Sequence, residues 1–415
     1  MDSLEQANDK AMTPPATPTR AGHLKCDSAS SDLENTLSSL RRGDSISSDT
    51  SHLWFADSAG HASTELFLFP HHVIDYAYHS NAEGKRNRPI GEGLWSDVYL
   101  ATPSISEPSR QGTETLCMTT ITPPSTPVHS RESSMSKGTL STLPFTYAIK
   151  VPASTSAREV LLAEARILSY LSRFPDAENH IVPFHGFDSR TGSLVLKAMD
   201  STLESWIHSD LNTLDEASRA QRLATVFPTI ALSLLHSLQW LQTKGCTHAD
   251  IKPSNILVSR QPSPSSDLHP VFSDFSSSVL SRSDASIASE VAPTGAGTWD
   301  YLDPQLLTSS SPTPVSAASD LWSLAITLLV LVLGASPYDA FKGNKYQQRE
   351  MIRQGAPMQC LAYDDAGLRN VRRLKTLSAH VGWDVQAWFT LVLVKEPGKR
   401  VGVAEWIGGL AERMG

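Results

Sequence analysis

Three polar side chains of different chemistry occur close together in the segment Thr247–Asn255. Asp250 supplies a carboxylate, Lys252 an amine two residues later, and Asn255 an amide three residues after that. The apolar run Ile256-Leu257-Val258 follows at once, so we expect a loop that leads into a strand. A polar loop after a helix would have a similar composition, but this spacing is hard to obtain by accident.

A second segment, Ile90–Val98, has the pattern of a strand, a glycine turn and another strand. Gly91 and Gly93 lack a Cβ, so backbone N–H groups there could approach the phosphates of a ligand closely. Most Gly-x-Gly matches are ordinary turns, and this pattern alone does not separate a phosphate site from a turn.

Charged residues recur at the ends of predicted strands and on a predicted helix. Lys150 ends the strand-like run Tyr147–Lys150, and Glu164 lies 14 residues later, on the inner stripe of a helix predicted over Glu159–Leu171. Asp274 follows another strand-like run. Taken singly, these residues could be a solvated lysine, a solvated glutamate and a turn aspartate.

In this order and spacing, the segments resemble those of the eukaryotic protein kinase family, over about residues 88–412. The resemblance implies an α+β, two-lobed fold with a strand-rich N-lobe and a helical C-lobe. It also implies ATP and Mg²⁺ as cofactors and proteins with serine or threonine as substrates. The lysine at position 252 resembles the serine/threonine kinases rather than the tyrosine kinases.

The same resemblance assigns roles to individual residues. Asp250 would accept the proton of the substrate hydroxyl, and Lys252 would steady the γ-phosphate. Asn255 and Asp274 would bind Mg²⁺. Lys150 would hold the α- and β-phosphates. The full set of residues implied for the ATP site is Gly91, Gly93, Ser96, Val98, Ala148, Lys150, Glu164, Leu196 and Leu257.

Later segments also match the family in order. Gly297–Gln305 resembles the end of an activation segment, in which Thr298 would face the catalytic aspartate and lysine. Ser319–Ser323 resembles the start of the buried helix that anchors the catalytic loop. Pro397–Arg400 resembles the late arginine segment, and Phe275 would pack beneath Leu168 and against His248.

Four positions depart from the family pattern: Ser96, Ala249, Ser276 and Gln305. An arginine usually stands at the position of Ala249 and receives the activation-loop phosphate, so this chain should not need that phosphate. Gln305 should still hydrogen-bond Arg400, but more weakly than the usual glutamate would. Apolar packing of Trp299, Tyr301 and Leu302 would then hold the segment.

Three functions therefore compete. Phosphoryl transfer depends on positioning and on charge neutralisation by a few groups. The charged and metal-binding residues that the family pattern requires are all found in this chain, as Lys150, Glu164, Asp250, Lys252, Asn255 and Asp274. We therefore favour an active serine/threonine kinase. A pseudokinase that binds ATP or acts as a scaffold is the main alternative. A small-molecule kinase is disfavoured because Thr298–Gln305 resembles a peptide-positioning loop.

The elements that position these residues follow from composition and periodicity. Residues 1–63 are rich in Ser, Thr, Asp and Pro and are predicted to be a disordered tail. Residues 64–87 are an N-terminal extension with two possible strands, Leu66–Phe69 and Val73–Tyr76. Next come an N-lobe (88–197) with a disordered insertion at 102–142 and a C-lobe (198–412). Long helices are predicted at Val226–Leu241 and Leu321–Leu333.

The tail and the insertion share a short repeat, Thr13–Pro18 and Thr122–Pro127. Ser or Thr followed by Pro in an extended segment fits an upstream proline-directed kinase. Simple low complexity explains the repeat equally well.

The bulk composition narrows partners and location. A net charge of -8 gives no argument for nucleic acid or an anionic membrane as a partner. The four cysteines are scattered, which argues against disulfides and zinc and for a reducing compartment. No signal peptide is visible, and the apolar stretch Leu321–Ala335 is short for a membrane span. We expect a cytoplasmic or nuclear protein, or one in both places.

Overall fold

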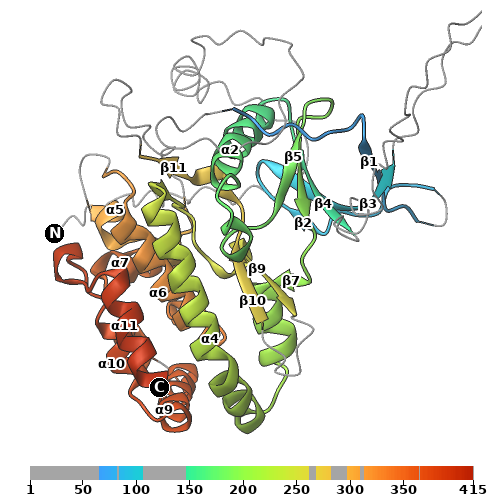
Figure 1. Ribbon diagram of the computed structural model, residues 1–415. Helices are drawn as coiled ribbons and strands as arrows, with labels where there is room; N and C mark the ends of the chain where they lie inside the picture. The colour runs from blue at the N-terminus through green and yellow to red at the C-terminus, as the bar shows by residue number, and fades with distance from the viewer. Residues whose placement is uncertain are drawn as a thin grey trace, which may run out of the picture. The chain divides into compact units, whose positions relative to one another are not determined.

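The strands that carry the Gly-x-Gly turn and Lys150 form one antiparallel sheet (Figure 1). Its order is β1-β3-β4-β6-β5, and β2 pairs with β3. The strands are β1 (Ile74–Tyr78), β2 (Gly91–Glu92), β3 (Ser96–Ile105), β4 (Tyr147–Pro152), β5 (Phe184–Asp188) and β6 (Ser193–Lys197). The computed structural model describes residues 65–81, 84–105, 146–260, 268–281, 297–308, 313–363 and 365–414.

Strand β3 is longer than the sequence predicts. The insertion predicted at 102–142 is wrong over residues 102–105, because these continue β3 and pair with β1, for example Thr102 with Ala77. Composition misleads here because a neighbouring strand satisfies the backbone hydrogen bonds of a segment rich in Ser, Thr and Pro. Residues 106–142 and the tail 1–63 lie outside the described part of the chain.

The N-terminal extension predicted at 64–87 contributes β1 to this same sheet, at the place where a strand is predicted over Val73–Tyr76. The sheet therefore begins upstream of residue 88, the predicted start of the N-lobe.

Helix α2 (Ala157–Leu171) packs one face against apolar residues of the sheet, in the main core cluster. Leu161, Ala165 and Leu168 recur at helical spacing and are fully buried, as the periodicity predicts. Glu164 lies on this same stripe and is only 1% exposed. A carboxylate on a buried stripe needs a charged or hydrogen-bonding partner.

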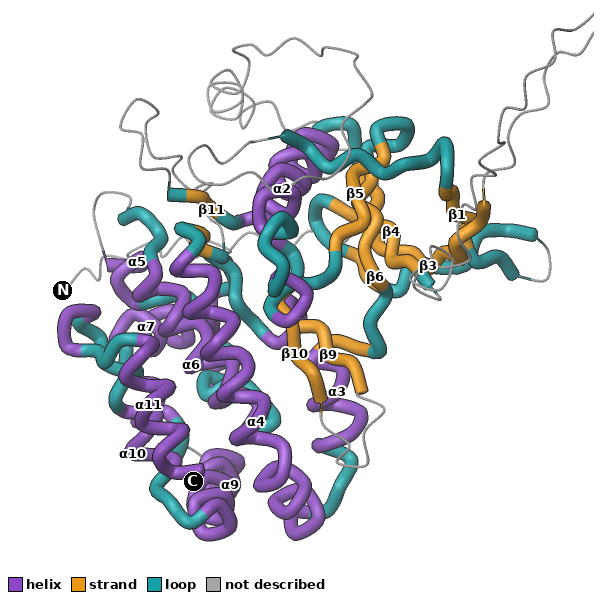
Figure 2. The backbone as a smooth tube through the Cα atoms, in the orientation of Figure 1, coloured by secondary structure: helices purple, strands orange, loops and turns teal. Residues whose placement is uncertain are grey.

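The second half of the described chain is mainly helical (Figure 2). Its helices are α3 (Leu203–Trp206), the π-helical turn η4 (Ile207–Leu211), α4 (Glu216–Thr243), α5 (Pro304–Thr308), α6 (Ala317–Leu333), α7 (Lys345–Gln354), α8 (Pro357–Cys360), α9 (Asp365–Val381), α10 (Val385–Thr390) and α11 (Val403–Met414). Together with the sheet, this confirms the two-lobed α+β architecture.

Helices α4 and α6 build the core of the helical lobe. α6 is buried along its length from Leu321 to Leu333, begins with a capping box at Ser316 and ends at Gly334 in the left-handed conformation. α4 begins at Glu216, ten residues before the predicted start, where Asp215 caps it. By length and composition alone α4 could cross a membrane, but 56% of its most apolar window is buried inside the fold.

Two small sheets flank the polar loop Thr247–Asn255. They are β10-β9-β7 and β11-β8. Their strands are β7 (Ser201–Thr202), β8 (Cys246–Thr247), β9 (Ile256–Arg260), β10 (Leu268–Phe272) and β11 (Val279–Leu280). Short 3-10 turns η3 (Ala177–Asn179), η5 (Pro253–Asn255), η6 (Phe275–Ser277), η7 (Trp299–Tyr301), η8 (Asp339–Phe341) and η9 (Pro397–Lys399) link the elements.

Candidate active site

The loop between β8 and β9 is anchored by Asp320, which lies in the first turn of α6. Its carboxylate accepts the backbone N–H of His248 at 2.6 Å and that of Ala249 at 2.9 Å. Burial raises the pKa of Asp320 to about 7, and the two N–H groups act in the opposite direction by favouring the carboxylate. The prediction that this helix start anchors the loop is confirmed.

Backbone strain is concentrated at the same place. Ala249 and Asp274 have φ values of 66° and 60°, and they are the non-glycine residues with positive φ in the part of the chain that the structure describes. The left-handed region costs a residue with a Cβ roughly 1–2 kcal/mol. Such strain gathers at functional sites, where the surrounding contacts enforce it.

Asp250, Lys252 and Thr298 form a hydrogen-bonded group. The Lys252 ammonium lies 2.7 Å from Asp250 Oδ2 and 2.8 Å from Thr298 Oγ1, and the threonine hydroxyl lies 3.2 Å from Asp250 Oδ1. The amide of Asn255 donates to Asp250 Oδ2 at 3.0 Å and to the Asp250 carbonyl at 2.9 Å. The structure thus brings together the three residues predicted to be catalytic and the threonine predicted to face them.

A buried charge cluster joins β4, α2 and the end of β10. The Lys150 ammonium lies 2.7 Å from Glu164 Oε2 and 2.7 Å from Asp274 Oδ1. The two carboxylates outweigh the effect of burial and raise the pKa of Lys150. Burial raises the pKa of Glu164 despite the ammonium, whereas for Asp274 the ammonium outweighs burial and lowers the pKa. At neutral pH we therefore expect a charged lysine facing a charged Asp274.

The residues around Asp274 fix its orientation. The Ser276 hydroxyl donates to Asp274 Oδ1 at 2.8 Å, and the Phe275 N–H donates to Glu164 Oε1 at 3.1 Å. Phe275 is fully buried, and its ring centroid lies 4.8 Å from that of His248, as predicted; Leu168 belongs to the same core cluster.

The surroundings of His248 favour its neutral form. Its Nε2 lies 3.0 Å from the Ser273 carbonyl, and its Nδ1 accepts the Asp250 N–H at 3.4 Å. Burial lowers the pKa of His248. A neutral ring with one donor and one acceptor satisfies both contacts.

The residues predicted to surround ATP fall mostly on one face of the sheet. Val98 pairs with Lys150, and Ala148 pairs with Leu196, so these side chains share a face by the two-residue period of a strand. Leu257 lies in the separate three-stranded sheet on β9 and packs against the same core cluster as Leu196.

The glycine turn precedes this face. The Gly93 N–H donates to the Ser96 carbonyl at 2.8 Å, and a Cβ on Gly93 would sit 3.3 Å from that oxygen. Gly91 lies in β2 opposite Val98, and Ser96 is buried at the start of β3. A backbone hydrogen bond thus closes the turn, and the absence of a Cβ at Gly93 avoids a tight contact with the Ser96 carbonyl oxygen.

The donor set fits Mg²⁺ and ATP. Both hydrogen bonds of Asn255 use its amide nitrogen, which leaves its oxygen available, and Asp274 is a carboxylate whose Oδ1 alone contacts Lys150 and Ser276. Among the described residues, no three His, Cys, Asp or Glu side chains gather as a metal cluster. Mg²⁺ does not need one, because it is bound through one or two carboxylates, waters and substrate phosphates.

The late arginine has a different partner from the one predicted. Arg400 pairs with Asp303 at 2.5 Å and 3.1 Å, and both side chains are buried. Gln305 instead donates to the Lys395 carbonyl at 3.2 Å. The predicted apolar packing is present in part, since Tyr301 packs against the main core cluster whereas Trp299 is 41% exposed, and the Asp303–Arg400 ion pair accompanies it.

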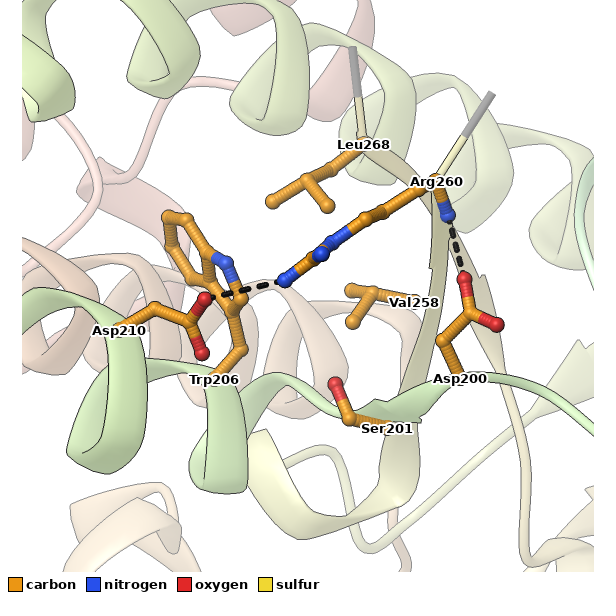
Figure 3. A pocket seen from close by; sticks show the side chains of 7 residues that line it. All are labelled: Asp200, Ser201, Trp206, Asp210, Val258, Arg260 and Leu268. Atoms are coloured by element: carbon orange, nitrogen blue, oxygen red, sulfur yellow. Dashed lines mark hydrogen bonds and ion pairs between the residues drawn. The ribbon is translucent and has the colours of Figure 1, made fainter. Parts of the chain in front are cut away.

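A cavity of about 360 Å³ lies between β7, α3, η4 and the β9–β10 pair (Figure 3). None of the residues predicted for the active site lines it. Figure 3 shows Arg260 extending across it toward Asp210, at 3.2 Å, while the Arg260 N–H donates to Asp200 at 2.7 Å. Its charged groups are therefore already paired, and we do not place the chemistry there.

Sequence reasoning misses Asp303 and the role of Ser276. Asp303 pairs with Arg400, whereas the predicted partner is Gln305, two positions later. The two residues of the pair lie 97 positions apart, and no local sequence pattern indicates that they meet. The Ser276 contact is local in sequence, because its hydroxyl reaches Asp274 Oδ1 only two residues back.

Comparison with known proteins gives a family. The model of the protein kinase domain matches residues 137–407, more than half of the chain. That range includes Lys150, Asp250 and Asp274 but not the glycine turn.

Individual relatives are similar over shorter stretches. Serine/threonine-protein kinase ISR1 of Eremothecium gossypii is 30% identical over 207 residues, 46% of this chain and 53% of the relative. The 3-phosphoinositide-dependent protein kinase 1 of Rattus norvegicus is 34% identical over 113 residues, 27% of this chain and 18% of the relative. Serine/threonine-protein kinase TOS3 of Saccharomyces cerevisiae is 27% identical over 177 residues, 42% of this chain and 30% of the relative. The chain thus spans about half of the first relative and less than a third of the other two.

Proposed function

The chain belongs to the protein kinase family, and we propose that it transfers the γ-phosphoryl group of ATP to serine or threonine hydroxyls of proteins. The observation that carries this proposal is the contact of one ammonium, that of Lys252, with both the Asp250 carboxylate and the Thr298 hydroxyl. This arrangement places an acceptor for a hydroxyl proton beside a positive charge, as phosphoryl transfer requires.

Each residue then has a defined task. Asp250 orients the substrate hydroxyl and accepts its proton, while Lys252 offers a positive charge where negative charge develops. Lys150, Asn255 and Asp274 would hold the nucleotide and its metal. When bound, magnesium and ATP supply the phosphoryl group and much of the charge neutralisation.

The choice of serine or threonine as acceptor rests on two features. Lys252 and Thr298 are the residues that resemble the serine/threonine kinases, and they contact each other. The names of the relatives ISR1 and TOS3 describe serine/threonine-protein kinases.

One observation favours the alternative of a pseudokinase. Asp274 Oδ1 accepts hydrogen bonds from both Lys150 and Ser276, which compete with a metal ion for that oxygen. We favour activity because the Ser276 hydroxyl contacts one oxygen only, and a carboxylate has about four acceptor sites.

The decisive experiment compares wild type with Asp250→Asn in a phosphotransfer assay with Mg²⁺, labelled ATP and a library of serine, threonine and tyrosine peptides. Loss of a general base typically lowers the rate 10²–10⁴-fold. Asp210→Asn is the matched control, since Asp210 lines the cavity in Figure 3 and does not belong to the group formed by Asp250, Lys252 and Thr298.

Two results would count against the proposal. Full activity in Asp250→Asn would remove Asp250 from the mechanism. An inactive wild type that still shows a nucleotide-induced thermal shift would establish the pseudokinase.

We also propose that a proline-directed kinase phosphorylates the Thr-Pro repeats at Thr13–Pro18 and Thr122–Pro127, in the cytoplasm or the nucleus. The support is the motif itself and the scattered cysteines. Phosphosite mapping of the protein from its own cells tests this, and unmodified threonines at all four motif positions would contradict it.

A further inference from the structure

The segment Glu65–Phe69 adds to the outer edge of the six-stranded sheet. The Phe69 N–H donates to the Phe187 carbonyl at 3.0 Å, and the Phe187 N–H donates to the Phe67 carbonyl at 2.7 Å. Leu68 forms a parallel bridge with Phe187, on the edge strand β5. The chain before β1 is therefore tied to the far side of the sheet from β1.

The same segment also holds the C-terminal end of α2. The Phe67 N–H donates to the Ser169 hydroxyl at 2.9 Å, and this hydroxyl donates to the Ala165 carbonyl at 2.6 Å. Just beyond the helix, Arg173 donates to the Glu65 carbonyl at 2.6 Å and lies 5.3 Å from the centroid of the Phe67 ring. Ser169 is 1% exposed, so this contact is shielded from water.

β5 is shaped for this approach. Gly186 has a φ of +131°, and a Cβ there would lie 2.6 Å from the Phe69 nitrogen and 2.8 Å from the Leu68 carbonyl carbon. Backbone atoms cannot move aside cheaply, so any other residue would push the segment off the strand. A register shift between Phe184 and Gly186 accompanies the contact.

Phe69 fixes the end of the segment. Its ring is 3% exposed and meets Tyr147 and Tyr76 edge to face, with centroid distances of 5.9 Å and 5.6 Å. Tyr147 begins β4, the strand that carries Lys150.

These contacts bear on the Lys150–Glu164 pair. Glu164 lies five residues before Ser169 on α2, and its carboxylate reaches Lys150 only while the helix stays close to the sheet. Because a short helix moves as a rigid element, contacts at its C-terminal end restrict the position of Glu164 as well.

We propose that Glu65–Phe69 is an intramolecular strap that holds α2 and so keeps Glu164 against Lys150, with Ser169 and Arg173 as positioning residues. This rests on the proposed kinase function, in which that ion pair orients the lysine for the nucleotide. The strap makes the sequence before the kinase domain part of the active conformation.

The test uses the full chain and Ser169→Ala, which removes the acceptor of the Phe67 N–H but keeps a good helix former. Ser378→Ala is a matched control, because Ser378 donates to Leu374 four residues back and accepts the Val385 N–H, in the same geometry but on α9. Hydrogen exchange of α2 is measured with and without nucleotide, and kcat and KM for peptide are measured separately.

We expect Ser169→Ala, but not Ser378→Ala, to speed exchange in α2 at least severalfold and to lower kcat roughly tenfold with little change in KM. Unchanged exchange in α2 overturns the strap, and so does faster exchange with full kcat. If wild type proves inactive, the kinase proposal fails and exchange alone decides the strap. If Ser169→Ala does not fold, Arg173→Ala gives the same measurements.

Discussion

Arg400 and Asp303 form a buried ion pair between the end of the activation segment and the loop before α11. Their atoms lie 2.5 Å and 3.1 Å apart, and Arg400 also donates to the carbonyls of Ala318 and Lys395. The Asp303 carboxylate in turn accepts the Gln305 N–H at the start of α5. Through Arg400, the end of the activation segment, the start of α6 and the loop before α11 are therefore held together.

We expect Asp303→Ala to destabilise the domain strongly. Removing one partner of a buried pair leaves the other charge unpaired, which costs about 3–5 kcal/mol. Gln305→Ala is the control, because its amide donates a neutral hydrogen bond to the Lys395 carbonyl, and such a bond is worth about 1 kcal/mol. Urea denaturation measures both, and equal loss of unfolding free energy in the two variants would show that the ion pair is not what holds the segment.

The sequence predicts the active-site residues better than their structural supports. The resemblance to the protein kinases assigns Lys150 and Glu164 to one ATP site, and local periodicity places Glu164 on the inner stripe of its helix, where the structure pairs it with Lys150. Asp303 and Arg400 lie 97 residues apart, and their pairing depends on how α5 and the loop before α11 meet. Nothing in local composition carries that information.

The fold shows the same division. The helices α2 and α6 end where they are predicted to end and begin two and four residues earlier than predicted, because their apolar residues are a local signal. The end of β3 is not foreseen as part of the sheet. For Leu66–Phe69 a possible strand is predicted but its partner β5 is not, because strand pairing joins residues that are distant in sequence. For residues 102–105, a composition rich in Ser, Thr and Pro is then a poor guide.

This difference predicts the outcome of deleting the insertion. Deleting residues 106–142 should leave the domain folded, since composition predicts that this stretch has no packed core. Deleting residues 102–142 should destabilise it, because residues 102–105 pair with β1. Thermal unfolding compares the two deletions, and aggregation of the shorter one would mean that residues 106–142 contribute to packing.

His185 makes the N-lobe sensitive to mild acid. Its Nε2 is buried with no hydrogen-bond partner in the described chain, and its ring meets Tyr147 edge to face at 5.0 Å. Burial, with the nearby Lys197, lowers the pKa of His185 from 6.5 to about 4. Folding therefore favours the neutral ring, and this contribution is complete above pH 6.5 and is lost as the pH falls toward 4.

The unfolding free energy of wild type should accordingly fall by up to about 3 kcal/mol more than that of His185→Phe between pH 6.5 and pH 4. Phe keeps an aromatic ring beside Tyr147 but cannot titrate. Denaturant titrations across this pH range provide the measurement, with other titrating groups shared by both proteins. Parallel pH profiles would show that His185 is already solvated in the folded state.

Activity should not depend on activation-loop phosphorylation. The residue before the catalytic aspartate, Ala249, has no side-chain donor, and its N–H is already bound to Asp320. The end of the activation segment is held without phosphate, by Thr298 on Lys252 and by the Asp303–Arg400 pair. A phosphate is needed only where such contacts are missing, because its effect is to order the segment through new charge-assisted bonds.

We therefore expect phosphatase-treated full-length protein to keep most of its activity, with loss of phosphate verified by mass spectrometry. Alanine at Ser283, Ser286 and Ser289, which lie outside the described residues, should also have little effect. Asp303→Ala should by contrast lose activity in either phosphorylation state, because it releases a contact that no phosphate at those serines replaces. A loss of more than about tenfold on dephosphorylation, roughly 1.4 kcal/mol of barrier, would mean that another basic residue receives the phosphate. In that case a basic residue elsewhere would bind the phosphate in place of the arginine that is usual at position 249.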